Sequence, residues 1–110
     1  MPHFMIHARF TDETAMTFAA RPSVQSAQVL LQRLQDLAEE SPLNGSLAHL
    51  FFTAGDHEMV LVVDMPSQRK AVAYALAMTR MLKVRTTTVP AFDATAMEDV
   101  IDDAGKVDGP

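Results

Sequence analysis

Histidine is the side chain best suited to proton transfer near neutral pH, and this sequence contains four. His3 and His7 lie four residues apart in a segment of alternating character, so both face the same side of a predicted strand. Four residues of strand span about 13 Å, so the two rings cannot share one zinc ion, whose nitrogen ligands lie about 2.1 Å from the metal. Each is either a polar residue at the edge of an interface or a group that contacts a substrate. His7 is farther from the terminus and is the better candidate for a general base.

Two further histidines could join a catalytic site. His49 lies in a second predicted strand, where it is either a solvated edge residue or a neighbour of His7 across one intervening strand, roughly 10 Å away. His57 lies in a hairpin connection, either as a turn residue or with Glu58 as an acid–base pair in which the carboxylate orients the imidazole. The candidate catalytic residues are therefore His7, His49 and His57.

Arg9 and Arg85 are the candidate anion-binding residues, because a guanidinium group binds a carboxylate through two parallel hydrogen bonds. The alternative for each arginine is a salt bridge to Asp64 or Glu58, or simple solvation. Met5 faces the same side of its strand as the histidines on either side of it. We expect Arg9, Arg85, Met5 and Glu58 to contact a ligand bound on this side.

The composition of the chain excludes several classes of protein. Its 110 residues predict one domain, and the absence of cysteine rules out disulfides and thiolate chemistry, which suits a reducing, cytoplasmic location. The nine Lys and Arg residues are scattered and the net charge is −5, so neither nucleic acid nor an anionic membrane is an expected partner. No apolar stretch approaches the roughly 20 residues of a membrane span, and no secretory signal is recognisable. Motifs of kinases, P-loop proteins, zincins and nucleophile-elbow hydrolases are absent, so we expect no metal and no cofactor.

Periodicity predicts the elements that must position these residues. Four segments are typical of strands: His3–Phe10, Leu47–Thr53, a run from Met59 to Asp64, and Lys83–Val89. Thr11-Asp12-Glu13 begins a short helix, and Ser23 and Ser67 cap two longer ones. The first long helix has an apolar stripe formed by Val24, Ala27, Leu30, Leu31, Leu34, Leu37 and Ala38. The second has a broad apolar face formed by Ala71, Val72, Ala75, Leu76, Met78, Thr79 and Leu82.

The end of the chain is predicted to be less well packed. After Phe92 an acidic helix carries Met97, Val100 and Ile101 at helical spacing. Residues from Gly105 onward read as a flexible tail. The expected organisation is therefore a single domain over residues 1–104 and a tail over residues 105–110.

The order β-α-β-β-α-β is typical of a ferredoxin-like α+β fold, in which two helices cover one face of a four-stranded antiparallel sheet. The first and third strands are the central pair of that sheet. Met59–Val63 is apolar at every position, and alternate side chains of a strand point to opposite faces, so both faces of this strand must be covered. The helices cover only one face. We therefore expect a second copy of the chain on the other, most simply in a dimer.

The last strand and the helix after it resemble the closing segment of the GYD-domain family, through the run Val84–Phe92. Thr11-Asp12 after the first strand, the Ser-capped helix, and Thr53-x-Gly55 before an apolar strand that ends in an acid and Pro66 extend this resemblance over residues 3–102. The family belongs to the dimeric α/β-barrel superfamily. The resemblance therefore implies a ferredoxin-like protomer that associates as a dimeric α/β barrel.

One motif departs from the family pattern, because Asp56-His57-Glu58 stands where the family has Gly-Tyr-Asp. Glu58 keeps the acid, and His57 replaces the tyrosine with another ring that can donate or accept a proton. The role of the family's tyrosine is therefore not transferred to this chain.

Two functions agree with these observations. The first is a homo-oligomeric module that binds a small apolar or anionic compound. The second is a cofactor-free enzyme of the isomerase, tautomerase or monooxygenase type with a histidine base, because superfamily relatives include small oxygenases, haem-degrading enzymes and isomerases that use the open sheet face as a pocket. The start Met1-Pro2-His3-Phe4 also resembles some tautomerases, in which an N-terminal proline acts as the base.

Overall fold

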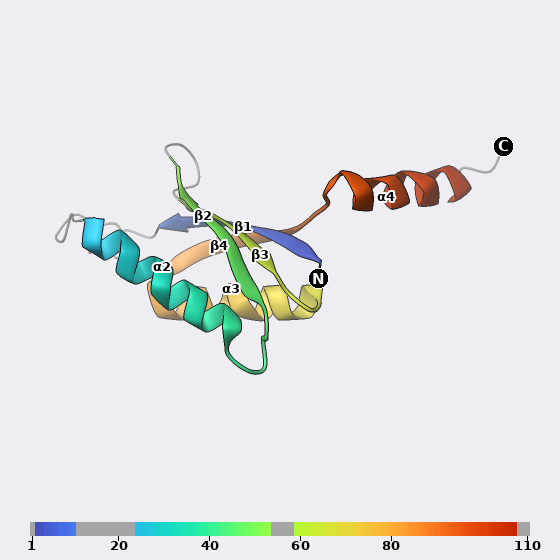
Figure 1. The fold of residues 1–110 in the computed structure, drawn as a ribbon. Coiled ribbons are helices and arrows are strands. Elements are labelled where there is room, and N and C mark those ends of the chain that lie inside the picture. Colours follow the sequence, from blue (N-terminus) through green and yellow to red (C-terminus); the bar gives the residue numbers. More distant parts are fainter. Residues whose placement is uncertain (1, 11–23, 54–58, 108–110) are drawn as a thin grey trace.

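The structure, a computed structural model of the chain, describes residues 2–10, 24–53 and 59–107. Its elements, in chain order, are β1 (His3–Phe10), α2 (Val24–Glu39), β2 (Ser46–Phe52), β3 (Met59–Asp64), α3 (Gln68–Leu82), β4 (Val84–Ala91) and α4 (Ala94–Val107) (Figure 1). The four predicted strands and the two long helices are confirmed, with the ends of the strands shifted by at most two residues. The short helix predicted from Thr11 and the hairpin at residues 54–58 lie outside the described residues.

The four strands form one antiparallel sheet in the order β2-β3-β1-β4, which makes β1 and β3 the central pair. Figure 1 shows α2 and α3 together on one side of this sheet. This arrangement confirms the predicted ferredoxin-like α+β fold. One face of the sheet is therefore covered by helices, and the opposite face is left for other contacts.

Side-chain alternation along the central strands separates the core from the opposite face. Phe4, Ile6 and Ala8 of β1 are buried in the core cluster that includes residues of both helices. The same cluster contains every second residue of β3, namely Met59, Leu61 and Val63. The residues between them point the other way and are only half-buried: Met5, His7, Val60 and Val62. The central strands therefore carry large side chains on both faces, as the sequence pattern predicts.

α2 begins at Val24 and buries a stripe of its side chains in the core. Leu30, Leu34 and Ala38 recur at four-residue steps and are almost fully buried. Leu37 is half-buried and packs against the same cluster. The predicted stripe is therefore confirmed at these positions.

α3 corrects one part of the sequence prediction. Its N-terminus is capped by Ser67, whose hydroxyl accepts a hydrogen bond from the Lys70 N–H at 3.2 Å. The buried stripe of the helix consists of Ala71, Tyr74, Ala75 and Met78. The predicted broad face is wrong for Val72 and Leu76, which are 41% and 64% exposed. Both residues lie more than a quarter turn from the centre of the buried stripe, so a helix resting on a sheet turns them outward.

The segment after α3 also departs from the prediction. β4 continues through Pro90 to Ala91, which an edge strand tolerates because its outer N–H groups have no ladder partner. α4 continues through Gly105 to Val107, three residues into the range predicted as a tail, and none of its side chains is buried. In Figure 1, α4 projects away from the sheet and from the other helices.

Tyr74 joins the two long helices, and its substitution should reveal an alkaline contribution to stability. The buried Tyr74 hydroxyl donates a hydrogen bond to the Leu34 carbonyl oxygen at 2.9 Å, and burial raises the pKa of this hydroxyl. Its stabilising contribution is fully present below about pH 10, the ordinary pKa of tyrosine, and is lost as the pH rises toward the higher folded-state pKa. We expect Tyr74→Phe to lower the free energy of unfolding by about 1 kcal/mol near neutral pH. Above about pH 10, the free energy of unfolding of this variant should fall less steeply with pH than that of the parent protein.

The ultraviolet absorbance of the phenolate follows this group alone, because the chain has one tyrosine and no tryptophan. Absorbance and circular dichroism should change together as the pH is raised. Ionisation near the ordinary pKa in a chain that keeps its native circular dichroism would contradict the prediction.

Candidate ligand-binding site on the open sheet face

The face of the sheet opposite α2 and α3, called the open face from here on, carries side chains that the strand register aligns in rows. One row crosses the sheet in the order Phe51, Val60, His7, Thr87. The next row is His49, Val62, Met5, Val89. Most of these side chains are apolar, and those of β1 and β3 are half-buried. The open face therefore has an apolar centre, and His7 and His49 lie in the same two rows as its apolar side chains.

Arg9 and Arg85 are direct cross-strand partners at one end of the open face. Residues directly opposite each other in an antiparallel pair have Cβ atoms about 5 Å apart, so the two long side chains can reach a common point. Both residues are exposed, and in the described part of the chain no carboxylate forms an ion pair with either. Like charges in this position repel, so an anion bound between them would be stabilising. The structure thus brings the two predicted anion-binding residues together.

His7 lies in the row next to this arginine pair, two residues or about 7 Å along β1 from Arg9. Its partners across the sheet are Val60 on β3 and Thr87 on β4. The ring is half-buried and its Nδ1 atom is fully buried. Thr87 adds a hydroxyl beside the imidazole. Thr87 was not predicted, because three consecutive threonines do not reveal which one points to the open face until the register is known.

His49 shares the open face with His7, which was one of the two alternatives from the sequence. Its cross-strand partner is Val62, whose partner on β1 is Met5, so one strand separates the two histidines. A register shift between Leu47 and His49 marks a bulge that turns His49 to this side. Its ring stacks on Phe51, with ring centroids 5.8 Å apart. His49 and Met5 therefore border the apolar centre, one row away from His7.

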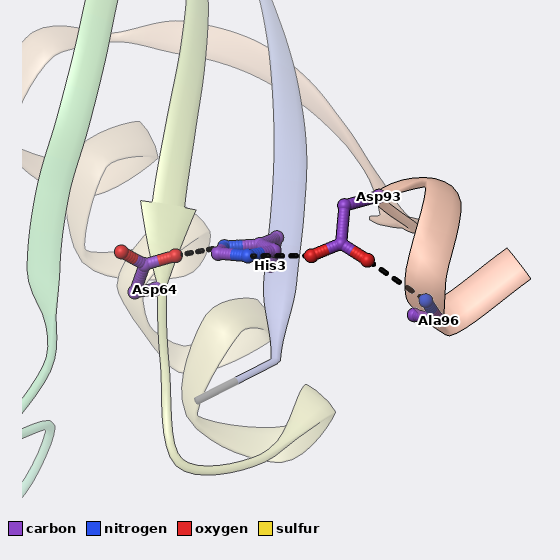
Figure 2. A network of polar contacts seen from close by, with 4 residues as sticks. All are labelled: His3, Asp64, Asp93 and Ala96. Carbon is purple, nitrogen blue, oxygen red and sulfur yellow. Dashed lines mark hydrogen bonds and ion pairs between the residues drawn. The ribbon is translucent and has the colours of Figure 1, made fainter.

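His3 has a different environment from His7, at the opposite end of the open face. Figure 2 shows its ring between the carboxylates of Asp64 and Asp93. Nδ1 of His3 pairs with Asp64, and Nε2 lies 3.9 Å from Oδ2 of Asp93. The other oxygen of Asp93 accepts a hydrogen bond from the Ala96 N–H at 2.8 Å and so caps the start of α4. His3 therefore joins three elements, β1, β3 and the start of α4.

This contact corrects the alternative in which Asp64 neutralises one of the arginines. Asp64 pairs with His3, six residues or about 20 Å along β1 from Arg9. Asp93 was not identified from the sequence. Its position just before an amphipathic helix is typical of an N-cap and could have revealed the hydrogen bond to Ala96, although not the contact with His3.

The remaining sequence candidates are not placed in this site. His57 and Glu58 lie outside the described residues. Pro2 is exposed, and its carbonyl oxygen accepts a hydrogen bond from the Met65 N–H at 3.1 Å. Within residues 2–10, 24–53 and 59–107, no group of three or more His, Asp or Glu side chains is arranged to hold a metal ion. None of the helices described is long and apolar enough to cross a bilayer.

Comparison with known proteins identifies the family of the chain. Searches of curated proteins and of solved structures each found no match. A family model described as the GYD domain matches residues 4–101, which include the sheet from the second residue of β1 onward, both long helices and the first half of α4. The ferredoxin-like fold is consistent with the dimeric α/β-barrel superfamily that the sequence resemblance implied. The chain belongs to the GYD-domain family.

Proposed function

We propose that this GYD-domain protein is a cytoplasmic, self-associating module that binds a small organic anion on the open face of its sheet. The observation that carries the proposal is the cross-strand pair of Arg9 and Arg85. Two adjacent guanidinium groups repel each other, which destabilises the pair when no anion is bound. A bound carboxylate offsets this repulsion, and its two oxygens accept parallel hydrogen bonds from a guanidinium group. The carboxylate of a small organic acid therefore suits this pair.

The rows beside the arginines favour an apolar body for the ligand. His7 and Thr87 come first and can donate or accept hydrogen bonds. Val60 lies in the same row, Met5 and Val62 lie in the next row, and all three are half-buried on the two central strands. An aromatic or aliphatic acid would place its carboxylate at the arginines and its hydrocarbon part on these side chains, where burial of apolar area stabilises the complex.

The same apolar centre supports self-association. Phe51 and Val89 at its margins are 54% and 38% exposed, so the apolar surface extends across all four strands. Contiguous apolar surface of this kind on a soluble domain marks an interaction site. A second copy placed face to face would cover it and would enclose a ligand between the two sheets.

A cofactor-free enzyme is the second candidate function, and His7 is the observation that favours it. The half-buried imidazole lies next to the arginine pair, where it could move a proton of a bound acid. His49 borders the same surface from β2. Recovery of the bound acid unchanged after incubation with the protein supports the binding module. Conversion that is lost in His7→Gln while binding is kept supports the enzyme.

The binding proposal is tested with benzoate, a planar carboxylate with an apolar ring, and with benzyl alcohol, its uncharged analogue. We expect benzoate to bind more tightly, and we expect Arg85→Gln to weaken it about 10- to 100-fold, because a hydrogen bond to a charged group contributes about 1.5–3 kcal/mol. Isothermal titration calorimetry measures both affinities. Changes in the NMR chemical shifts of the Thr87 and Arg9 backbone amides on addition of benzoate locate the site.

Arg33→Gln is the matched control, since Arg33 is an exposed arginine on α2, on the other side of the sheet. It should leave benzoate affinity unchanged. Equal affinities for benzoate and benzyl alcohol, or an Arg85→Gln variant that binds as the parent does, would refute an anion site at the arginine pair.

A further inference from the structure

α4 is an amphipathic helix that has no buried side chain and no extensive packing against the other elements that the structure describes. Its apolar side chains Met97, Val100, Ile101 and Ala104, called the α4 stripe, recur at three- and four-residue steps and so share one face. Met97 is 42% exposed and Ile101 is 59% exposed, and no residue of the helix is buried. A stripe of this kind is normally covered, and residues 2–10, 24–53 and 59–93 provide no surface that covers it.

α3 carries an exposed apolar stripe on its outer side. Val72, Ala73 and Leu76, called the α3 stripe, point away from the sheet, opposite the buried residues of the helix. Arg69 lies one turn before this stripe and Arg80 one turn after it, on the same face. The outer surface of α3 is therefore a short apolar strip with a cation at each end.

The charges of the two helices are complementary. α3 contains three cationic residues, Arg69, Lys70 and Arg80, and no acidic residue. α4 contains four acidic residues and one lysine: Glu98, Asp99, Asp102, Asp103 and Lys106. Glu98 and Asp103 flank the α4 stripe, so helix-on-helix packing would join apolar to apolar and place these carboxylates near the arginines. The two helices also match in length, at about 21 and 22 Å.

α4 cannot reach the outer side of its own α3. Only Phe92 and Asp93 separate β4 from α4, and two extended residues span about 7 Å. The path would have to round the edge strand β4 and cross the thickness of α3, which is about 10 Å. Asp93 is in addition held by His3 and by the cap on Ala96 (Figure 2), which directs the helix away from the body (Figure 1).

We propose that the α4 stripe of one copy of this chain packs on the α3 stripe of a second copy. A second copy is favoured over a membrane because the polar side of α4 is acidic and would be repelled by anionic lipid. This contact goes beyond the proposed function, because it uses the outer side of the helix layer and not the open face. The protein thus has two independent surfaces for contact with other copies of the chain, one on each side of the protomer.

The absence of cysteine makes disulfide trapping a direct test. Leu76→Cys protein and isotopically heavy Ile101→Cys protein are mixed and mildly oxidised, and mass spectrometry identifies the linked peptides. Disulfides form where two Cα atoms approach to about 5.5 Å. We expect the mixed 76–101 disulfide in about tenfold excess over the product of a control pair, because docking raises the effective concentration of the two thiols.

The control pair combines Leu76→Cys with Asp99→Cys, which lies on the polar side of the same helix α4. Equal yields from the two pairs would overturn the proposal. So would an intrachain disulfide in a single chain that carries both Leu76→Cys and Ile101→Cys. Binding of the parent protein to phosphatidylcholine vesicles without the mixed disulfide would assign α4 to a membrane and would also overturn it.

A repeat of the trapping in a Val62→Glu background separates this contact from association through the open face. Val62 lies on the open face and belongs to neither stripe. We expect the mixed disulfide to persist there. Its loss only in that background would overturn the independence of the two contacts. If the disulfide is absent while the parent protein still sediments as a dimer, the α4 contact is wrong and the open-face contact stands.

Discussion

Val62→Glu should disrupt the proposed association of two copies through the open face. Val62 lies on the central strand β3, in the middle of the open face, with His49 and Met5 as its neighbours across the sheet. Face-to-face packing of two copies about a two-fold axis would bring position 62 of each copy into the interface, so two unpaired carboxylates would lose their water. We expect the dissociation constant of the open-face contact to rise by at least about 100-fold, equivalent to about 2.8 kcal/mol. Sedimentation equilibrium over a range of concentrations measures it.

The matched control is Val29→Glu, the same change at a 54% exposed position on α2. It should leave open-face association at the parent level. Val62→Glu itself should stay folded, because the side chain points away from the core and β-propensity effects amount to about 1 kcal/mol. A folded Val62→Glu protein that associates as tightly as the parent would refute the open-face interface.

Leu61→Ala should remove a large part of the folding stability. Leu61 is the next residue along β3 and points the other way, where it is completely buried among the side chains of the helix layer. Its cross-strand partners are Ile6 on β1 and Leu50 on β2, so the truncation leaves a cavity at the centre of the sheet. We expect the free energy of unfolding to fall by about 2–5 kcal/mol. Urea denaturation at one fixed protein concentration measures this change.

Val29→Ala provides the surface comparison, since Val29 is an aliphatic side chain of the helix layer that is mostly exposed. Its effect should stay within about 0.5 kcal/mol. Similar losses for Leu61→Ala and Val29→Ala would mean that the core does not lie between the sheet and the helices. The prediction for neighbouring residues 61 and 62 is thus opposite in kind: one change affects folding, and the other affects association.

The site could be predicted only in part, because it combines local pattern with strand register. Alternation alone placed His3, Met5 and His7 on one side of β1, and the register confirms it. Nothing local shows that Arg9 faces Arg85, since the two are far apart in sequence and meet only when β4 pairs with β1. The same holds for His3 and Asp64, which the sequence analysis did not pair.

The two exposed stripes show a different limit. Val72 and Leu76 have the composition of core residues, and composition alone assigned them to the buried face. Their direction depends on which side of α3 meets the sheet. On the side that meets the core lie Ala71, Tyr74, Ala75 and Met78, and the Tyr74 hydroxyl donates a hydrogen bond to the Leu34 carbonyl oxygen. A hydrophobic residue is buried only where another surface is available to cover it.

The sequence by itself determined the order and type of the described elements, the central position of β1 and β3, and the apolar character of both faces of β3, because periodicity and turn residues act over a few neighbours. The tertiary structure decided which distant side chains meet: Arg9 with Arg85, His3 with Asp64 and Asp93, and Tyr74 with Leu34. It also decided that α4 leaves the body of the protomer. These features arise from the register of the sheet and the rotation of each helix upon it, which depend on packing over the whole chain and not on any local pattern.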